Sequence, residues 1–157
     1  KGQLGRKTGG GFYRMQKLDN GEKKKEVFDL SQSLWRDAKK ISIEGDVNII
    51  LEDSVRGNYA WEVMGSTLSY AANLIPEIAD DIVNVDRAMR WGFAWSKGPF
   101  EILDELGPIN FINKCKAKNI TIPKMLEVLL ASSGSGKFYS NDDQYLTIKG
   151  EYKNILN

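Results

Sequence analysis

The apolar residues of positions 55–131 recur at steps of three and four, and this period constrains the fold more than any other feature. That spacing places the side chains along one face of an α-helix. In the stretch 55–79 the aligned residues are Trp61, Met64, Leu68, Ala71, Ala72 and Ile75. The pattern predicts a long amphipathic helix, and Pro76 should end or bend it because proline disrupts helix interiors.

The same period predicts further helices along the chain. One should cover about 82–93, with Ile82, Val85, Met89 and Phe93 aligned, Asp80 or Asp81 as its cap and Gly92 as its stop. The next begins at Pro99, turns Phe100, Ile102, Leu103 and Leu106 inward, and ends at Gly107. A short helix should start at Pro108, and Thr121 should cap a last one over 122–132.

Short alternating segments near both ends predict strands. These are 26–36 and 39–45 near the start, and 144–156, where two strands should flank Lys149-Gly150. The pair Asn20-Gly21 is a hairpin signal. The lysines at 23–25 are interpreted as a solvated loop rather than a binding patch.

The end of the chain echoes its beginning. "GGGFYRM" (9–15) has a weak copy in "GSGKFYS" (134–140), and "FDLSQSLWR" (28–36) has one in "LTIKGEYK" (146–153). The repeat suggests that residues 1–53 are the tail of a first unit with a linker and hairpin, and that 54–157 form a complete second unit. The start at Lys1 rather than Met also suggests a piece of a longer polypeptide.

The glycine-rich stretch "GRKTGGGFY" (5–13) invites comparison with phosphate-binding loops. In a P-loop the Lys-Thr pair follows the glycines, whereas here Lys7-Thr8 precede them. A dinucleotide fingerprint must open a helix, and here a charged segment follows. A tight turn anchored by Phe12 and Tyr13 is the favoured interpretation; a contact of Arg6 or Lys7 with a phosphate from a neighbouring domain stays open.

Composition narrows the possible chemistry. Basic and acidic residues number 22 and 21, so a strongly basic nucleic-acid binder is not expected. There is no histidine, which excludes His-based triads and His-ligated zinc. Cys115 is the only cysteine, which fits a reducing, cytoplasmic compartment, and no apolar run is long enough to span a membrane.

The segment 75–107 resembles the C-terminal helical domains of NAD-dependent 3-hydroxyacyl-CoA dehydrogenases. The family motif is filled by Asp86, Ala88, Met89, Gly92, Gly98, Pro99, Phe100, Glu101, Asp104 and Gly107. The closing motif of the family matches Gly5, Lys7, Gly9, Gly11, Phe12 and Tyr13. The sequence of residues 70–93 resembles a narrower group within this family, the multi-domain bacterial fatty-acid β-oxidation proteins that also carry an enoyl-CoA hydratase domain.

The resemblance implies a mainly α fold like the C-terminal domain of 6-phosphogluconate dehydrogenase, with short β-hairpins at the ends. It implies a parent enzyme that oxidises (3S)-3-hydroxyacyl-CoA to 3-oxoacyl-CoA, with NAD held by a Rossmann domain outside this chain. The expected partners are that domain, a first helical repeat, a hydratase domain, acyl-CoA and a second subunit in a homo-oligomer. The chain itself should be non-catalytic, without cofactor or metal; a stand-alone helical interaction module is the alternative.

Five residues remain candidates for contact with substrate or with another domain. They are Arg87, Arg90, Trp91, Trp95 and Lys97, a basic and aromatic group beside the Gly-Pro-Phe turn. Packing with buried arginine stems is the competing interpretation. The acidic group Glu77, Asp80, Asp81, Glu101 and Asp104 should serve in capping and surface pairing, with Asp86 and Asp104 anchoring helix starts or loops. Trp61 stands where the family has its substrate-positioning asparagine, which argues against a second active site.

Overall fold

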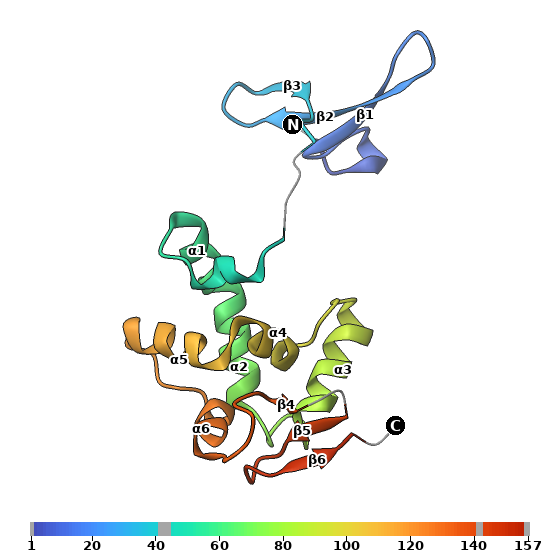
Figure 1. Ribbon diagram of the computed structural model, residues 1–157. Helices are drawn as coiled ribbons and strands as arrows, with labels where there is room; N and C mark the ends of the chain where they lie inside the picture. Colours follow the sequence, from blue (N-terminus) through green and yellow to red (C-terminus); the bar gives the residue numbers. More distant parts are fainter. Residues whose placement is uncertain (1, 41–44, 141–142, 156–157) are drawn as a thin grey trace. The chain divides into compact units, whose positions relative to one another are not determined.

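The computed structural model describes residues 2–40, 45–140 and 143–155 (Figure 1). It divides into two compact units, an N-terminal unit (Lys1–Glu44) and a C-terminal unit (Gly45–Asn157). The sequence-based boundary was placed at 53–54. Residues 47–51 go with the C-terminal unit because Ile50, only 3% exposed, joins its core.

The N-terminal unit is a small antiparallel sheet. After the 3₁₀ turn η1 (Arg6–Thr8), the strands β1 (Tyr13–Lys17), β2 (Lys23–Asp29) and β3 (Leu34–Asp37) pair in the order β1-β2-β3. The predicted hairpin is confirmed: Gly21 has φ of 85° in the turn between β1 and β2. Most of the strand expected over 39–45 falls on 41–44, outside the described residues.

The lysines at 23–25 lie in β2, so the expectation of a solvated loop there was wrong. An antiparallel strand can carry lysines when they stay near water and find partners across the ladder. Lys24 forms an ion pair of 2.6 Å with Asp37. The ammonium group of Lys25 lies 4.6 Å from the centre of the Tyr13 ring.

The C-terminal unit is mainly helical, as the apolar period predicted. A 3₁₀ segment η2 (Val47–Leu51) precedes a long helix made of α1 (Val55–Ala60), the π-helical segment η3 (Trp61–Gly65) and α2 (Ser66–Asn73). The helices α3 (Ile82–Phe93), α4 (Pro99–Leu106), α5 (Pro108–Ala117) and α6 (Lys124–Ala131) follow. A second antiparallel sheet, in the order β4-β5-β6, is made of β4 (Tyr139–Ser140), β5 (Gln144–Leu146) and β6 (Tyr152–Asn154).

In this unit α2 packs against α4 and α6, and α4 also packs against α3 and α5 (Figure 1). The predicted apolar face is buried: Trp61, Leu68 and Ala72 are each at most 2% exposed. The Trp61 ring lies 4.9 Å from that of Phe111, centre to centre. A side chain on Gly65 would meet the Trp61 ring, which packs across that glycine.

Most helix ends agree with the sequence signals, and the differences have local causes. The long helix ends at Asn73, before Pro76, and Asp81 caps α3 by accepting from Asn84 N–H at 2.8 Å. Gly92 does not stop α3, which continues to Phe93 because Ala94 takes the left-handed conformation (φ 55°) instead. Phe93, expected on the inner face, is 72% exposed.

The cap expected at Thr121 was also wrong. The last helix begins at Lys124, so that Pro123 occupies the cap position. Within the described residues, no helix has the length and apolar character needed to cross a membrane.

Candidate functional site

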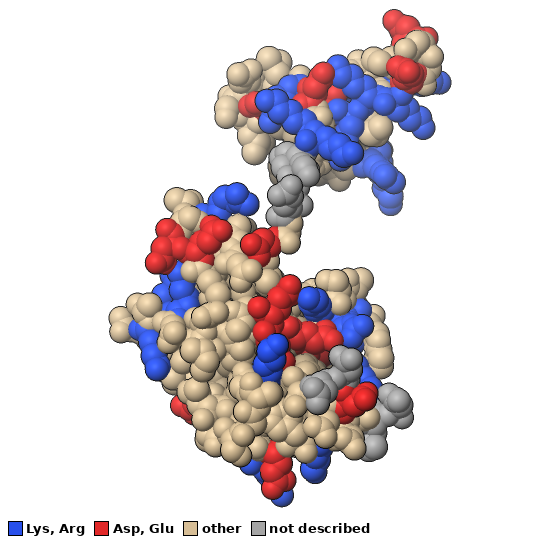
Figure 2. All heavy atoms as spheres, in the orientation of Figure 1, with Lys and Arg blue, Asp and Glu red and all other residues tan. Residues whose placement is uncertain are grey.

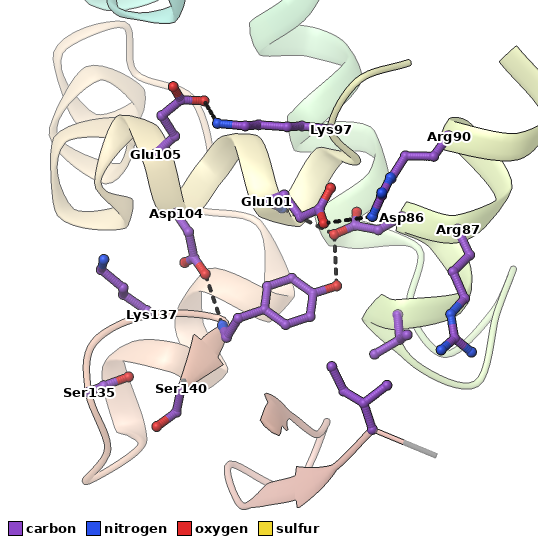
Figure 3. A pocket seen from close by; sticks show the side chains of 13 residues that line it. Asp86, Arg87, Arg90, Lys97, Glu101, Asp104, Glu105, Ser135, Lys137 and Ser140 are labelled. Carbon is purple, nitrogen blue, oxygen red and sulfur yellow. Dashed lines mark hydrogen bonds and ion pairs between the residues drawn. The ribbon is translucent and has the colours of Figure 1, made fainter. Parts of the chain in front are cut away.

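A pocket of about 760 Å³ lies where α3 and α4 meet the segment around β4 (Figure 3). We call it the α3–α4 pocket. Its ionisable lining balances four basic with four acidic residues: Arg87, Arg90, Lys97 and Lys137, and Asp86, Glu101, Asp104 and Glu105. It contains much of the sequence motif that carried the family resemblance.

Asp86 lies at the floor of the pocket and is only 3% exposed. Its carboxylate accepts hydrogen bonds from the backbone N–H of Phe100 at 2.9 Å, from that of Glu101 at 3.1 Å, and from the hydroxyl of Tyr139 at 2.8 Å. It therefore caps the first turn of α4 from a different helix. Such a contact satisfies N–H groups that a helix start leaves unpaired.

Burial raises the pKa of Asp86 to about 7. Removal from water disfavours the charged form of a carboxyl group, and the negative charge of Glu101 adds to this effect. The three hydrogen bonds oppose the rise because they stabilise the charged form. Asp86 is thus a structural acceptor whose charge changes near neutral pH.

Asp104 binds the start of the second sheet. It accepts from the backbone N–H groups of Phe138 and Tyr139 at 2.7 and 2.8 Å. Burial raises the pKa of Asp104, and burial together with Asp86 raises the pKa of the Tyr139 hydroxyl. Tyr139 is therefore fixed between two carboxyl groups, Asp104 at its backbone N–H and Asp86 at its hydroxyl.

Gly98 is required here by space rather than by backbone angle. Its φ of −79° suits any residue, but an added Cβ would overlap the Asp86 side chain and Cα. Pro99 follows as the first residue of α4, and the Glu101 carboxylate accepts from Gly98 N–H at 2.6 Å. The Gly98-Pro99 turn can lie against Asp86 only because Gly98 has no side chain, and the Asp86 carboxylate in turn holds the start of the helix that follows this turn.

The remaining motif residues divide into packed and unexplained ones. Phe100 is fully buried, with its ring 4.9 Å from that of Phe138. Gly107 ends α4 with φ of 78°, and Met89 is half-buried. Gly92 is exposed with open space around it, and nothing in the structure explains it.

The five candidate contact residues are only partly brought together. Arg90 pairs with Glu101 at 3.1 Å and Lys97 with Glu105 at 2.9 Å, both at the rim of the pocket. Arg87 also lines the pocket, and its guanidinium lies 5.8 Å from the Trp91 ring centre. Trp91 itself is 77% exposed, and the half-buried Trp95 is not among the lining residues.

Sequence reasoning did not identify two polar residues that organise the unit. One is Tyr139, whose position in the repeated Phe-Tyr pair was the available signal. The other is Lys114, only 9% exposed, which donates to the carbonyls of Leu51 and Glu52 at 3.2 Å each and pairs with Asp53. Lys114 is three residues after the buried Phe111, and that spacing on an apolar face was its signal.

Neighbouring Cys115 is fully buried, and burial raises the pKa of its thiol, so it serves in packing. Across the described ranges, no group of three or more acidic, histidine or cysteine side chains could hold a metal ion.

The glycine-rich loop of the N-terminal unit closes on itself. Gly5 and Gly10 exchange backbone hydrogen bonds of 2.9 and 3.1 Å, and Gly5 and Gly9 have φ of 120° and 85°. The loop leads into β1 rather than into a helix, so it does not fit a dinucleotide-binding loop. The expected anchoring by Phe12 and Tyr13 is not found among the described residues, where their exposures are 70% and 57%.

Comparison with known proteins gives relatives that match between 64% and 99% of the chain. A probable 3-hydroxyacyl-CoA dehydrogenase of Bacillus subtilis is 31% identical over 99% of this chain. Putative fatty acid oxidation complex trifunctional enzymes of Rickettsia felis and Rickettsia prowazekii are 36% and 33% identical over 64% and 78% of it. No family model and no solved structure matches.

The chain spans only 21%, 14% and 18% of the lengths of these three relatives. The family indicated by the sequence motif of residues 86–107 is the family of these relatives. By sequence, this chain is a relative of one segment of the 3-hydroxyacyl-CoA dehydrogenase and fatty acid oxidation proteins.

Proposed function

We propose that these residues are part of a multi-domain fatty-acid β-oxidation protein that oxidises (3S)-3-hydroxyacyl-CoA with NAD. The similarity to a probable 3-hydroxyacyl-CoA dehydrogenase over 99% of the chain supports this activity for the whole protein. The relatives named as putative trifunctional enzymes support several activities in one polypeptide, and a hydratase domain is the further one proposed here. NAD would be held by a Rossmann domain outside these residues and would supply the hydride acceptor.

Within that protein, the segment has an architectural role. The observation that carries this proposal is the use of the motif carboxylates. Asp86 and Asp104 together accept four backbone N–H bonds and one hydroxyl bond from their own unit. Asp86 thus holds the start of a helix and Asp104 the start of a strand, and these five bonds occupy more than half of the about eight acceptor positions of the two carboxylates.

The segment would form a wall on the substrate side of the enzyme, with a fold like the 6-phosphogluconate dehydrogenase C-terminal domain. Arg87, Arg90 and Lys97 at the pocket rim, with Trp91 outside it and Trp95 nearby, are the residues proposed to contact acyl-CoA or an adjoining domain. A stand-alone helical interaction module is the alternative, favoured by the 77% exposure of Trp91.

Two assays test these statements. NADH formation from (3S)-3-hydroxybutyryl-CoA should be measured with the product of the complete reading frame and with residues 1–157 alone. We expect activity only in the former. Activity of residues 1–157 alone would contradict the architectural role, and an inactive complete protein would favour the interaction module.

Calorimetric titration of residues 1–157 with acetoacetyl-CoA tests the rim. A substrate contact is supported if Arg87→Gln or Lys97→Gln weakens this binding. The control Lys116→Gln, on the exposed surface of α5, should leave the binding unchanged. No binding assigns the rim to contacts between domains.

A further inference from the structure

The two small sheets of the chain are built alike. In the first, the Phe28 N–H donates to the Phe12 carbonyl at 2.9 Å; in the second, the Leu146 N–H donates to the Phe138 carbonyl at 2.7 Å. Tyr13 then pairs opposite Val27, and Tyr139 opposite Tyr145. The sequence echo between 9–15 and 134–140 is therefore also an equivalence of strand register.

The equivalent aromatic pairs have different surroundings. Phe138 is fully buried against Phe100, and Tyr139 is held by Asp104 at its N–H and by Asp86 at its hydroxyl. Phe12, by contrast, is 70% exposed and Tyr13 57% exposed. A large exposed aromatic pair in a position that is buried in its internal copy indicates a docking surface.

Charge indicates the kind of partner. The net charge of the chain is near zero, but the charge is distributed unevenly between the two units. Lys1–Glu44 contain eleven Lys and Arg and six Asp and Glu, so this unit is basic. Gly45–Asn157 contain eleven Lys and Arg and fifteen Asp and Glu, so this unit is acidic. Figure 2 shows Lys and Arg gathered over the N-terminal sheet. The helical body that holds the second sheet is thus acidic, and a body of the same kind would complement the basic first sheet.

We infer that Phe12 and Tyr13 dock the first sheet onto a helix pair built like α3–α4, which lies outside residues 1–157. Phe12 would fill an apolar pocket, as Phe138 does. One carboxylate would accept from the backbone N–H groups of Phe12 and Tyr13, and a second from the Tyr13 hydroxyl. In α3–α4 these carboxylates, Asp86 and Asp104, are eighteen positions apart, and the partner pair should show matching aspartates.

The α3–α4 pair of this chain is not the occupant, because β4 already fills its acceptors. A second copy of the chain would meet the same filled site. The occupant is therefore a further helical body, and this inference rests on the internal repeat rather than on the proposed dehydrogenase activity.

Hydrogen–deuterium exchange followed by mass spectrometry tests the inference. A peptide covering 9–15 should exchange at least tenfold more slowly in the product of the complete reading frame than in residues 1–157 alone. A peptide covering the turn 30–33 should exchange equally in both. Protection of an amide reports how rarely its hydrogen bond opens.

Variants of the complete protein separate the contacts. Tyr13→Phe should speed exchange at 9–15 about tenfold, the cost of a hydrogen bond to a charged group. Phe12→Ala should speed it about a hundredfold, as for an aromatic core truncation. Leu30→Ala is the matched control, because Leu30 is 72% exposed, on the β2–β3 turn, and should change nothing.

Equal exchange of 9–15 in both proteins would overturn the inference, as would a complete reading frame without a second helix pair carrying two aspartates. Protection of 9–15 in residues 1–157 that grows with protein concentration would indicate self-association and would also overturn it. NADH formation measured on the same samples keeps the two proposals separate. A complete protein whose segment 9–15 is protected from exchange but which forms no NADH refutes only the proposed dehydrogenase activity.

Discussion

Replacing Asp86 by asparagine should change how the stability of the C-terminal unit depends on pH. The buried carboxyl group has a pKa raised from 3.8 to about 7 in the folded state. Between these values the folded protein keeps a proton that the unfolded chain releases. The stability contributed by this proton is therefore fully present below about pH 4 and is lost as pH rises through 7.

The size of the effect follows from the shift. One pKa unit corresponds to about 1.4 kcal/mol, so a rise of about three units gives about 4 kcal/mol across this range. Asparagine has nearly the same shape but cannot titrate. The unfolding free energy of wild type should fall relative to that of Asp86→Asn by about 4 kcal/mol between pH 4 and 8.

Urea unfolding followed by circular dichroism at a series of pH values measures this difference, because the described α-helices all lie in the C-terminal unit. Asp80→Asn is the matched control, since Asp80 is exposed two residues before the start of α3. Parallel pH profiles for wild type and Asp86→Asn would refute the reasoning. A pH-dependent difference of equal size in Asp80→Asn would refute it as well.

Three further substitutions test the packing of the unit. Gly98→Ala should destabilise it by about 1–3 kcal/mol, because the new Cβ overlaps Asp86; chemical denaturation measures this. Lys114→Met should cost about 1–3 kcal/mol by leaving the carbonyls of Leu51 and Glu52 without their donor, measured in the same way. Trp61→Ala should cost about 3–5 kcal/mol and lower the thermal midpoint, because a fully packed ring is lost.

Each of these changes has a control of the same chemistry on the surface. Gly92→Ala adds its methyl group to open space in α3 and should leave stability unchanged or raise it by up to about 1 kcal/mol. Lys116→Met and Trp91→Ala alter exposed positions and should stay within about 0.5 kcal/mol of wild type. A core variant that behaves like its surface control would contradict the structural role assigned to it.

The candidate site was accessible to sequence reasoning only in outline. The motif around Asp86 and Gly98 was recognisable as a unit, and the anchoring roles of Asp86 and Asp104 were expected. Their hydrogen-bond partner Tyr139 lies 53 residues beyond Asp86, and no local pattern connects the two. The exposure of Trp91 and Phe93 likewise depends on which part of α3 packs against other helices. The helical period of the sequence does not contain that information.

The sequence by itself determined the helices of 55–131, most of their ends and the repeated Phe-Tyr sheets, because period, caps and turn residues act between neighbours in the chain. It also excluded histidine-based chemistry, which depends only on composition. Tertiary structure alone decided that Asp86 caps a helix other than its own, that Lys114 is buried, and that lysines 23–25 form a strand. These outcomes depend on desolvation and on contacts between distant segments, which exist only once the chain has packed.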